Sequence, residues 1–157
     1  MNPRRFSVSC MDNQERSSIE KACERLVVVY THYVDHGQAS RIPELFTEEG
    51  KWSAPGIEML GREQLQSGFA QREANRGRMS RHVCTNFLCE VEDAEHASGV
   101  VYLTLYRHDG AADRRTSPLE APVLVGEYRD RFVRTPEGWR MASRQLEVSF
   151  SRDGLNS

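Results

Sequence analysis

A carboxylate and an imidazole are the most informative pair of side chains in this sequence. Asp35 falls at the end of a helical pattern, and His82 opens an apolar strand pattern. A carboxylate that orients an imidazole makes a general base, and a general base in a water-poor cavity can remove a proton from carbon. If the fold aims both side chains into one cavity, the sequence favours a lyase or an isomerase.

Each of these residues also has a purely structural interpretation. His82 fits a core or rim histidine that is satisfied by a backbone carbonyl. Asp35 fits a surface aspartate, although a carboxylate near the C-terminus of a helix opposes the helix dipole and therefore needs a partner such as His82. Tyr30 lies on the main apolar stripe of the same helical pattern, where a core tyrosine with a bonded hydroxyl is the default.

Five further residues are candidates for substrate binding. Strand alternation places Asn86 on one face with His82, Cys84 and Leu88, and this mixed face suits a cavity wall. Arg144 can supply a charge to the cavity, but it also fits an exterior ion pair. The aromatic candidates fit ordinary core equally well. The five residues are Asn86, Trp52, Phe69, Tyr128 and Arg144.

No metal site is expected from the sequence. His32 and His36 have the i, i+4 spacing of a metal-binding pair, but no Glu completes a zinc-binding motif around them. The sequence also contains no nucleophile elbow and no glycine-rich phosphate loop. We therefore expect chemistry without a metal or an organic cofactor.

The composition is typical of one globular domain. A chain of 157 residues fits a single domain that buries its own core. The net charge is −2, with both signs mixed along the chain, so nothing attracts nucleic acid. The four cysteines lack CxxC spacing and are expected to be reduced thiols in a cytoplasmic protein. No signal peptide and no membrane span are recognised.

The domain is expected to span residues 17–150. Residues 1–16 are predicted to be a disordered N-terminal lead, and residues 151–157 a C-terminal tail. Whether Met1 or Met11 is the natural start stays open.

The order of the periodic patterns predicts an α+β fold. A first helix is predicted from a cap at Ser17 and Ser18 to Gly37, followed by helices over 40–47 and 61–75. Strands are predicted over 51–53, 81–91, 97–107, 122–134 and 138–150. Helices first and then long strands joined by hairpins indicate helices packed on one face of a curved antiparallel sheet.

Several segments together carry a resemblance to a known family. The segment from Gly126 to Arg144 resembles the C-terminal hairpin of the nuclear transport factor 2-like superfamily, in particular its SnoaL-like branch. Tyr30, followed by Asp35 and then by residues 45–47, resembles the first-helix signature of that branch.

Two more segments fall in the same order. Residues 61–63 resemble the glycine-led helix of the branch, and residues 81–86 resemble its His-bearing strand. The similarity covers roughly residues 17–150. It implies a cone-shaped, curved antiparallel sheet with the N-terminal helices packed on its concave face.

The resemblance also implies roles for the candidate residues. Members of the superfamily with an Asp and a His at the matching places include dehydratases, a dehydrochlorinase and polyketide cyclases. In the dehydratase type, the resemblance implies that His82 abstracts the proton and that Asp35 fixes its tautomer. Tyr30 would donate a hydrogen bond to a carbonyl or leaving oxygen. The implied substrate is a small, hydrophobic, cyclic carbonyl compound.

The same superfamily contains proteins without chemistry, so the fold alone does not decide the function. Among them are transport adaptors and the small subunits of ring-hydroxylating dioxygenases. The alternative hypothesis is therefore a non-catalytic small-molecule-binding protein or such a subunit. Because relatives commonly pair through the open sheet surface, a homodimer or homotrimer is expected, and neither nucleic acid nor a membrane is an expected partner.

Overall fold

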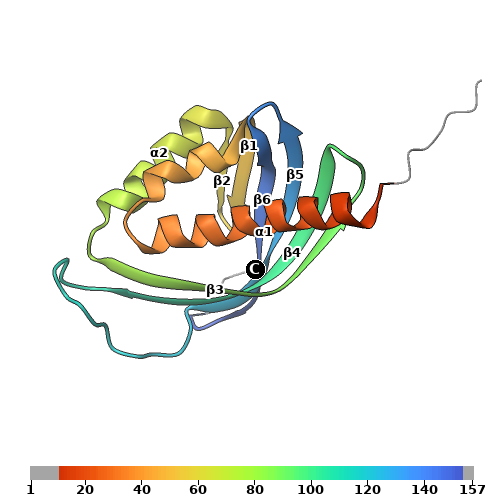
Figure 1. Cartoon of the computed structure of the whole chain (residues 1–157). Helices are drawn as coiled ribbons and strands as arrows, with labels where there is room; N and C mark the ends of the chain where they lie inside the picture. Colours follow the sequence, from red (N-terminus) through yellow and green to blue (C-terminus); the bar gives the residue numbers. More distant parts are fainter. Residues whose placement is uncertain (1–10, 154–157) are drawn as a thin grey trace, which may run out of the picture.

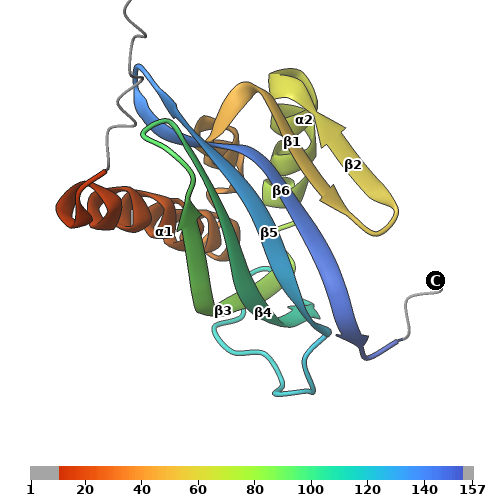
Figure 2. The ribbon, with the colours of Figure 1, turned by 90° about the vertical axis from the view of Figure 1, so that its right-hand side faces the viewer.

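One curved sheet with helices on its concave face makes up the part of the protein that the structure describes. The computed structural model describes residues 11–153. Six strands form a single sheet in the order β2-β1-β6-β5-β4-β3, and the helices lie on one side of it (Figure 1). Figure 2 shows the sheet from the right-hand side of Figure 1, with α2 behind the strands and α1 beside the edge strand β3. The predicted α+β class is confirmed.

The element bounds follow the predicted order. They are α1 (Asn13–Asp35), η1 (Ala39–Leu45), β1 (Phe46–Ala54), β2 (Ile57–Leu60), α2 (Gly61–Ala74), β3 (Arg78–Val91), β4 (His96–Asp109), β5 (Leu124–Thr135) and β6 (Gly138–Ser151). The predicted helix over 40–47 is a short 3-10 helix, η1, which contains Pro43. Helix-to-sheet contacts bury an apolar core in which Tyr30, Phe46 and Phe132 are each at most 2% exposed.

Helix α1 begins earlier than predicted. Its N-cap residue is Asp12, whose carboxylate accepts a hydrogen bond from the backbone N–H of Glu15 at 2.7 Å. The predicted cap at Ser17 and Ser18 is therefore wrong, and residues 13–16 are helical.

The remaining parts of the predicted lead and tail are only partly described. Residues 1–10 and residues 154–157 lie outside the described residues. Within residues 11–153, no helix is both long enough and apolar enough to cross a membrane.

Helix α1 ends at the residue of chemical interest. Its last residue is Asp35, and Gly37, with a φ of +70°, turns the chain toward η1. The buried side of α1 packs against β3 and comprises Ile19, Cys23, Leu26, Val27, Tyr30 and Val34. This packing brings Asp35 to the beginning of β3.

The sheet is mixed because one strand pair is parallel. Strands β3, β4, β5 and β6 pair with their neighbours antiparallel, as predicted. Strand β1 instead joins β6 in parallel, with residues 51–53 beside residues 143–145. A short antiparallel partner, β2, follows β1 after the turn at Pro55 and Gly56 and adds a strand to the predicted set.

A bulge in β3 changes which side chains face the core. The pairing of β3 with β4 shifts between Thr85 and Leu88, and Asn86 has a φ of +55°. After the bulge, Phe87 packs against the core, whereas Asn86 is exposed and Leu88 is 63% exposed. The predicted alternation, which put Asn86 and Leu88 on the face of His82, is therefore wrong beyond Thr85.

The bulge gives a test of backbone strain. We predict that Asn86→Val lowers the free energy of unfolding by about 1–2 kcal/mol, because a β-branched residue is strained at positive φ. Asn86→Gly should stay within about 0.5 kcal/mol of the parent, since glycine adopts this conformation freely. Urea unfolding of both variants measures the difference, with Thr85→Val as a control at the neighbouring exposed position. Equal stability of the two Asn86 variants would contradict the assignment.

Candidate active site

The imidazole of His82 and the carboxylate of Asp35 are in direct contact. Nδ1 of His82 lies 2.6 Å from Oδ1 of Asp35, and the two side chains are 10% and 5% exposed. A neutral imidazole that donates its Nδ1–H to the carboxylate carries its lone pair on Nε2. The arrangement can therefore act as a general base that is oriented by a carboxylate.

Two further hydrogen bonds fix the carboxylate of Asp35. The hydroxyl of Ser80 donates to Oδ1 at 2.7 Å, and the backbone N–H of His82 donates to Oδ2 at 2.7 Å. Burial alone would raise the pKa of Asp35, but the hydrogen bonds from His82 and Ser80 outweigh burial and hold this pKa below its ordinary value. Asp35 is therefore ionised at neutral pH.

The protein contains a second His–Asp contact that lies in solvent. Nδ1 of His96 lies 2.9 Å from Oδ1 of Asp93 at the turn between β3 and β4, and the two side chains are 50% and 60% exposed. This contact has the same atoms but lacks burial. It is a natural control for the buried pair.

A buried ion pair lies on the same concave side of the sheet. Arg144 on β6 donates Nε and Nη2 to the carboxylate of Asp130 on β5, at 2.8 and 2.6 Å, and both side chains are fully buried. Burial alone would lower the pKa of Arg144, but the attraction of Asp130 outweighs it and raises that pKa. Arg144 is thus a permanent internal cation, and the exterior ion pair considered for it is excluded.

Aromatic rings enclose this cation. The guanidinium carbon of Arg144 lies 4.4 Å from the ring centroid of Tyr30 and 4.2 Å from that of Tyr128. Trp52 donates its indole N–H to the hydroxyl of Tyr30 at 3.0 Å. Phe69 packs edge-on against both Tyr30 and Trp52. We call these five residues the aromatic–arginine cluster, and its centre is filled by side chains, since Tyr30, Tyr128 and Arg144 are at most 2% exposed.

The thiol of Cys84 is affected by charges from both buried pairs, His82–Asp35 and Arg144–Asp130. Cys84 is on β3, one inward position after His82. Burial raises the pKa of Cys84 to about 11, and the charges of Arg144, Asp130 and Asp35 all act on it. The structure thus brings four of the five candidate binding residues into one cluster, whereas Asn86 lies exposed at the bulge.

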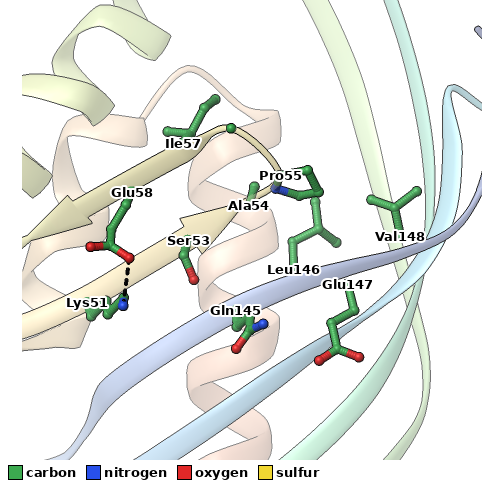
Figure 3. A pocket seen from close by; sticks show the side chains of 11 residues that line it. Lys51, Ser53, Ala54, Pro55, Ile57, Glu58, Gln145, Leu146, Glu147 and Val148 are labelled. Atoms are coloured by element: carbon green, nitrogen blue, oxygen red, sulfur yellow. Dashed lines mark ion pairs between the residues drawn. The ribbon is translucent and has the colours of Figure 1, made fainter. Parts of the chain in front are cut away.

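One member of the buried pair borders a surface hollow, whereas His82 is not among the residues that line it. Asp35 lines a hollow of about 650 Å³ between the ends of α1 and α2 and the start of β3. A different hollow, of about 690 Å³, lies in the fork between the β1–β2 hairpin and β6 (Figure 3). Its lining residues Lys51, Ser53 and Gln145 alternate with the inward-pointing Trp52 and Arg144, so the fork hollow is separate from the candidate site.

The family follows from a comparison with known domains. The family model of the SnoaL-like domain matches residues 15–145 of the chain. The chain belongs to the SnoaL-like family. No curated protein matches the sequence.

Solved structures with the fold of this SnoaL-like protein are numerous but distant in sequence. A scytalone dehydratase candidate from Novosphingobium aromaticivorans is 18% identical, with a TM-score of 0.77 and coverage of 93% of this chain and 94% of that chain. LinA is 17% identical, with a TM-score of 0.71 and coverage of 94% and 98%. A protein from N. aromaticivorans described as NTF2-like with a cystatin-like fold is 21% identical, with a TM-score of 0.67 and coverage of 89% and 92%. At these identities the similarities show the fold alone.

Two residues of the site have no counterpart among the sequence predictions. Ser80 and Asp130 each supply a partner that a candidate residue needs. Ser80 precedes His82 by two positions and so shares its strand face, which is a signal that alternation provides. Asp130 could have been found only by pairing β5 with β6, where it stands opposite Arg144.

The structure gives no sign of a metal centre in its described part. Within residues 11–153, no three His, Cys, Asp or Glu side chains gather closely enough to hold a metal ion. The rings of His32 and His36 stack with their centroids 5.3 Å apart.

The buried ion pair of the SnoaL-like domain leads to a stability prediction. Asp130→Ala should lower the free energy of unfolding by about 3–5 kcal/mol, because it leaves the buried charge of Arg144 without a partner. As a control, Glu92→Ala removes the exposed partner of Arg131 and should cost less than about 1 kcal/mol. Urea denaturation of both variants measures the two losses. Comparable losses of unfolding free energy would mean that the buried Arg144–Asp130 pair matters no more for stability than the exposed pair.

Proposed function

We propose that this SnoaL-like protein is a cofactor-free lyase or isomerase that removes a proton from carbon next to a carbonyl group. One observation carries the proposal: an imidazole and an ionised carboxylate are in contact at 2.6 Å and nearly buried, and the carboxylate borders a hollow. Burial strengthens the interaction between the two groups and limits competition from water. The same contact at His96 lacks both advantages.

In the proposed reaction, Nε2 of His82 takes the proton from the carbon atom. The electron pair of the broken C–H bond forms a double bond to the carbonyl carbon, and the carbonyl oxygen becomes an enolate oxygen. Asp35 stabilises the imidazolium that forms. The enolate then either expels a β-hydroxyl group, which takes the proton of the imidazolium and leaves as water, or takes that proton back at another carbon atom, as in an isomerisation.

Two donors in the aromatic–arginine cluster support stabilisation of the enolate oxygen. Among the described residues, Nη1 of Arg144 is a buried donor with no hydrogen-bond partner. The hydroxyl of Tyr30 accepts the N–H of Trp52, so its own proton can be donated. Because the centre of the cluster is filled, a substrate oxygen reaches these donors only after side chains move. Trp52, Phe69 and Tyr128 give this region the aromatic walls that suit a small, hydrophobic, cyclic substrate.

Exchange of carbon-bound protons with solvent tests the proposal without knowledge of the natural substrate. We predict that the protein accelerates deuterium uptake at the α-carbon of a cyclic ketone within a panel of β-hydroxy and unsaturated cyclic ketones. His82→Ala should reduce the accelerated rate by about 10²–10⁴-fold, because it removes the base. Asp35→Asn should lower kcat and leave KM nearly unchanged. Mass spectrometry in D₂O measures the uptake.

His96→Ala is the matched control, because it removes the imidazole of the exposed His–Asp contact. It should exchange at the parental rate. Full activity of both His82→Ala and Asp35→Asn would refute the mechanism.

The alternative function is a non-catalytic small-molecule-binding protein or the small subunit of a ring-hydroxylating dioxygenase, and the packing around Arg144 fits it as well as it fits an enzyme. Two nitrogens of the Arg144 guanidinium donate hydrogen bonds to Asp130, and two tyrosine rings cover the guanidinium. Such packing stabilises a domain whether or not it performs chemistry. Binding of a panel ketone without any deuterium uptake would favour this alternative.

We also propose that the protein forms a homodimer or homotrimer through the open face of its sheet. Three apolar side chains on neighbouring strands are exposed on that face: Val83 (44%), Leu88 (63%) and Tyr102 (50%). Apolar side chains that gather on an uncovered sheet are typical of an interface.

The assembly can be tested by mass. We expect light scattering to give a multiple of the 18.0 kDa chain mass for the parent, and the single-chain mass for Tyr102→Glu, because a charge cannot be buried in the interface without a partner. Val28→Glu, which alters an exposed apolar residue of α1, should keep the parental mass. A parental protein at 18.0 kDa would refute the proposal.

A further inference from the structure

Ser80 stands between two charged groups that do not form an ion pair with each other. Its side chain is buried, at 3% exposure. The hydroxyl donates its proton to Oδ1 of Asp35 at 2.7 Å and accepts a hydrogen bond from Nη2 of Arg72 at 3.0 Å. A hydroxyl has one proton to donate and lone pairs to accept with, so the direction of this chain is fixed from Arg72 through Ser80 to Asp35.

Arg72 is an unusual cation in this fold. It lies in the last turn of α2 and is half-buried, and its Nη2 also donates to the backbone carbonyl of Val34 at 3.3 Å. Burial lowers the pKa of Arg72, the charge of Arg78 lowers it further, and the charge of Asp35 opposes both. Within residues 11–153, no carboxylate lies within 4.0 Å of its guanidinium nitrogens. Arg72 thus acts on Asp35 through a hydroxyl.

We propose that Ser80 and Arg72 are positioning residues of the His82–Asp35 pair: together they keep the Asp35 carboxylate ionised and hold it in the single orientation from which it contacts the imidazole. The inference rests on the proposed function only where it concerns catalysis. That Ser80 and Arg72 control the charge and orientation of the Asp35 carboxylate does not depend on the proposed function.

Three hydrogen bonds determine the orientation of the Asp35 carboxylate. Oδ1 of Asp35 is shared by Ser80 and the ring of His82, while Oδ2 accepts the backbone N–H of His82. A rotation of the carboxylate would break all three. Arg72 prevents the hydroxyl of Ser80 from turning away, because it occupies the accepting side of that oxygen.

Other charges surround the pair and set the background for a pH experiment. Charged groups that line the hollow of Asp35, or that act on Asp35, Arg72 or Cys84, come from several elements: Arg72 and Glu73 from α2, Arg76 after it, Arg78 and His82 from β3, Arg107 and Asp109 from β4, Asp130 from β5 and Arg144 from β6. Arg78 is neutralised by Asp109, and Arg144 by Asp130. The element η1 adds only the hydroxyl of Ser40 to the hollow that Asp35 lines.

The direct test is the titration of Asp35 in the full chain, followed by the carboxyl ¹³C signal. Ser80→Ala removes a hydrogen bond that favours the ionised carboxylate, so the pKa of Asp35 should rise relative to the parent. Arg72→Met should raise it as well, because it removes a nearby positive charge. Arg72→Lys and Ser80→Thr, which keep the charge and the hydroxyl, should retain the parental midpoint.

Two residues of the same hollow provide matched controls. Ser40 donates its hydroxyl to Glu73 at 2.6 Å, and Arg76 is exposed on the hollow's wall. Neither Ser40→Ala nor Arg76→Met should move the titration of Asp35. If Ser80→Ala does not fold, the carboxyl ¹³C titration of Asp35 in Arg72→Met tests the inference instead. An Asp35 titration that is the same in Ser80→Ala, Arg72→Met and the controls would overturn the inference.

Ketone exchange separates this inference from the proposed function. If the parent exchanges protons, Ser80→Ala and Arg72→Met should lower kcat roughly tenfold with KM unchanged, because the base is less well oriented. If the parent shows no exchange but Asp35 titrates as expected, the proposed function fails while the inference stands. Parental kcat in both variants together with an unchanged Asp35 titration refutes the inference alone.

Discussion

The geometry of the site depends on the hydrogen bonds that the carboxylate of Asp35 accepts. Asp35 ends α1, and its carboxylate accepts three hydrogen bonds from β3, two from side chains and one from the backbone. An acidic residue at the C-terminal end of a helix is unfavourable on its own, because it opposes the helix dipole. The cost is offset only when β3 lies close enough to donate. The same bonds therefore hold the helix on the sheet and set the orientation of the imidazole.

The interior of the domain has a second polar centre, which differs in its chemistry. The Arg144–Asp130 pair is fully buried and is enclosed by tyrosine rings, so its charges are compensated inside the core. One nitrogen of Arg144 is left as a donor without a partner among the described residues. The proposed enolate chemistry needs two components, a base and a hydrogen-bond donor for the oxygen, and the imidazole of His82 and this nitrogen of Arg144 are the groups proposed for them.

Much of the fold could be predicted from the sequence, since the long strands alternate clearly and Gly37 marks the end of the first helix. The helix start was mispredicted, because Ser17 and Ser18 are good cap residues that happen to lie inside the helix. The sequence pattern does not reveal the bulge at Asn86, because the residue at positive φ is an asparagine and not a glycine. This single residue reverses the alternation of the strand. Contact between Asp35 and His82 was expected from the resemblance to a family. Neither the bond from Ser80 nor the burial of Arg144 follows from spacing, since both depend on which strands and helices meet in space.

The parallel pairing of β1 with β6 has a consequence for how the chain folds as it is synthesised. Residues 51–53 find their partners only at residues 143–145, which follow much later in the sequence. Contacts of such long sequence separation are slow to form, because a long loop must be closed first. When the ribosome has made the β1–β2 hairpin, the edge on which it will dock does not yet exist. That hairpin cannot dock until β6 has been made, and until then the nascent chain carries an unpaired strand edge.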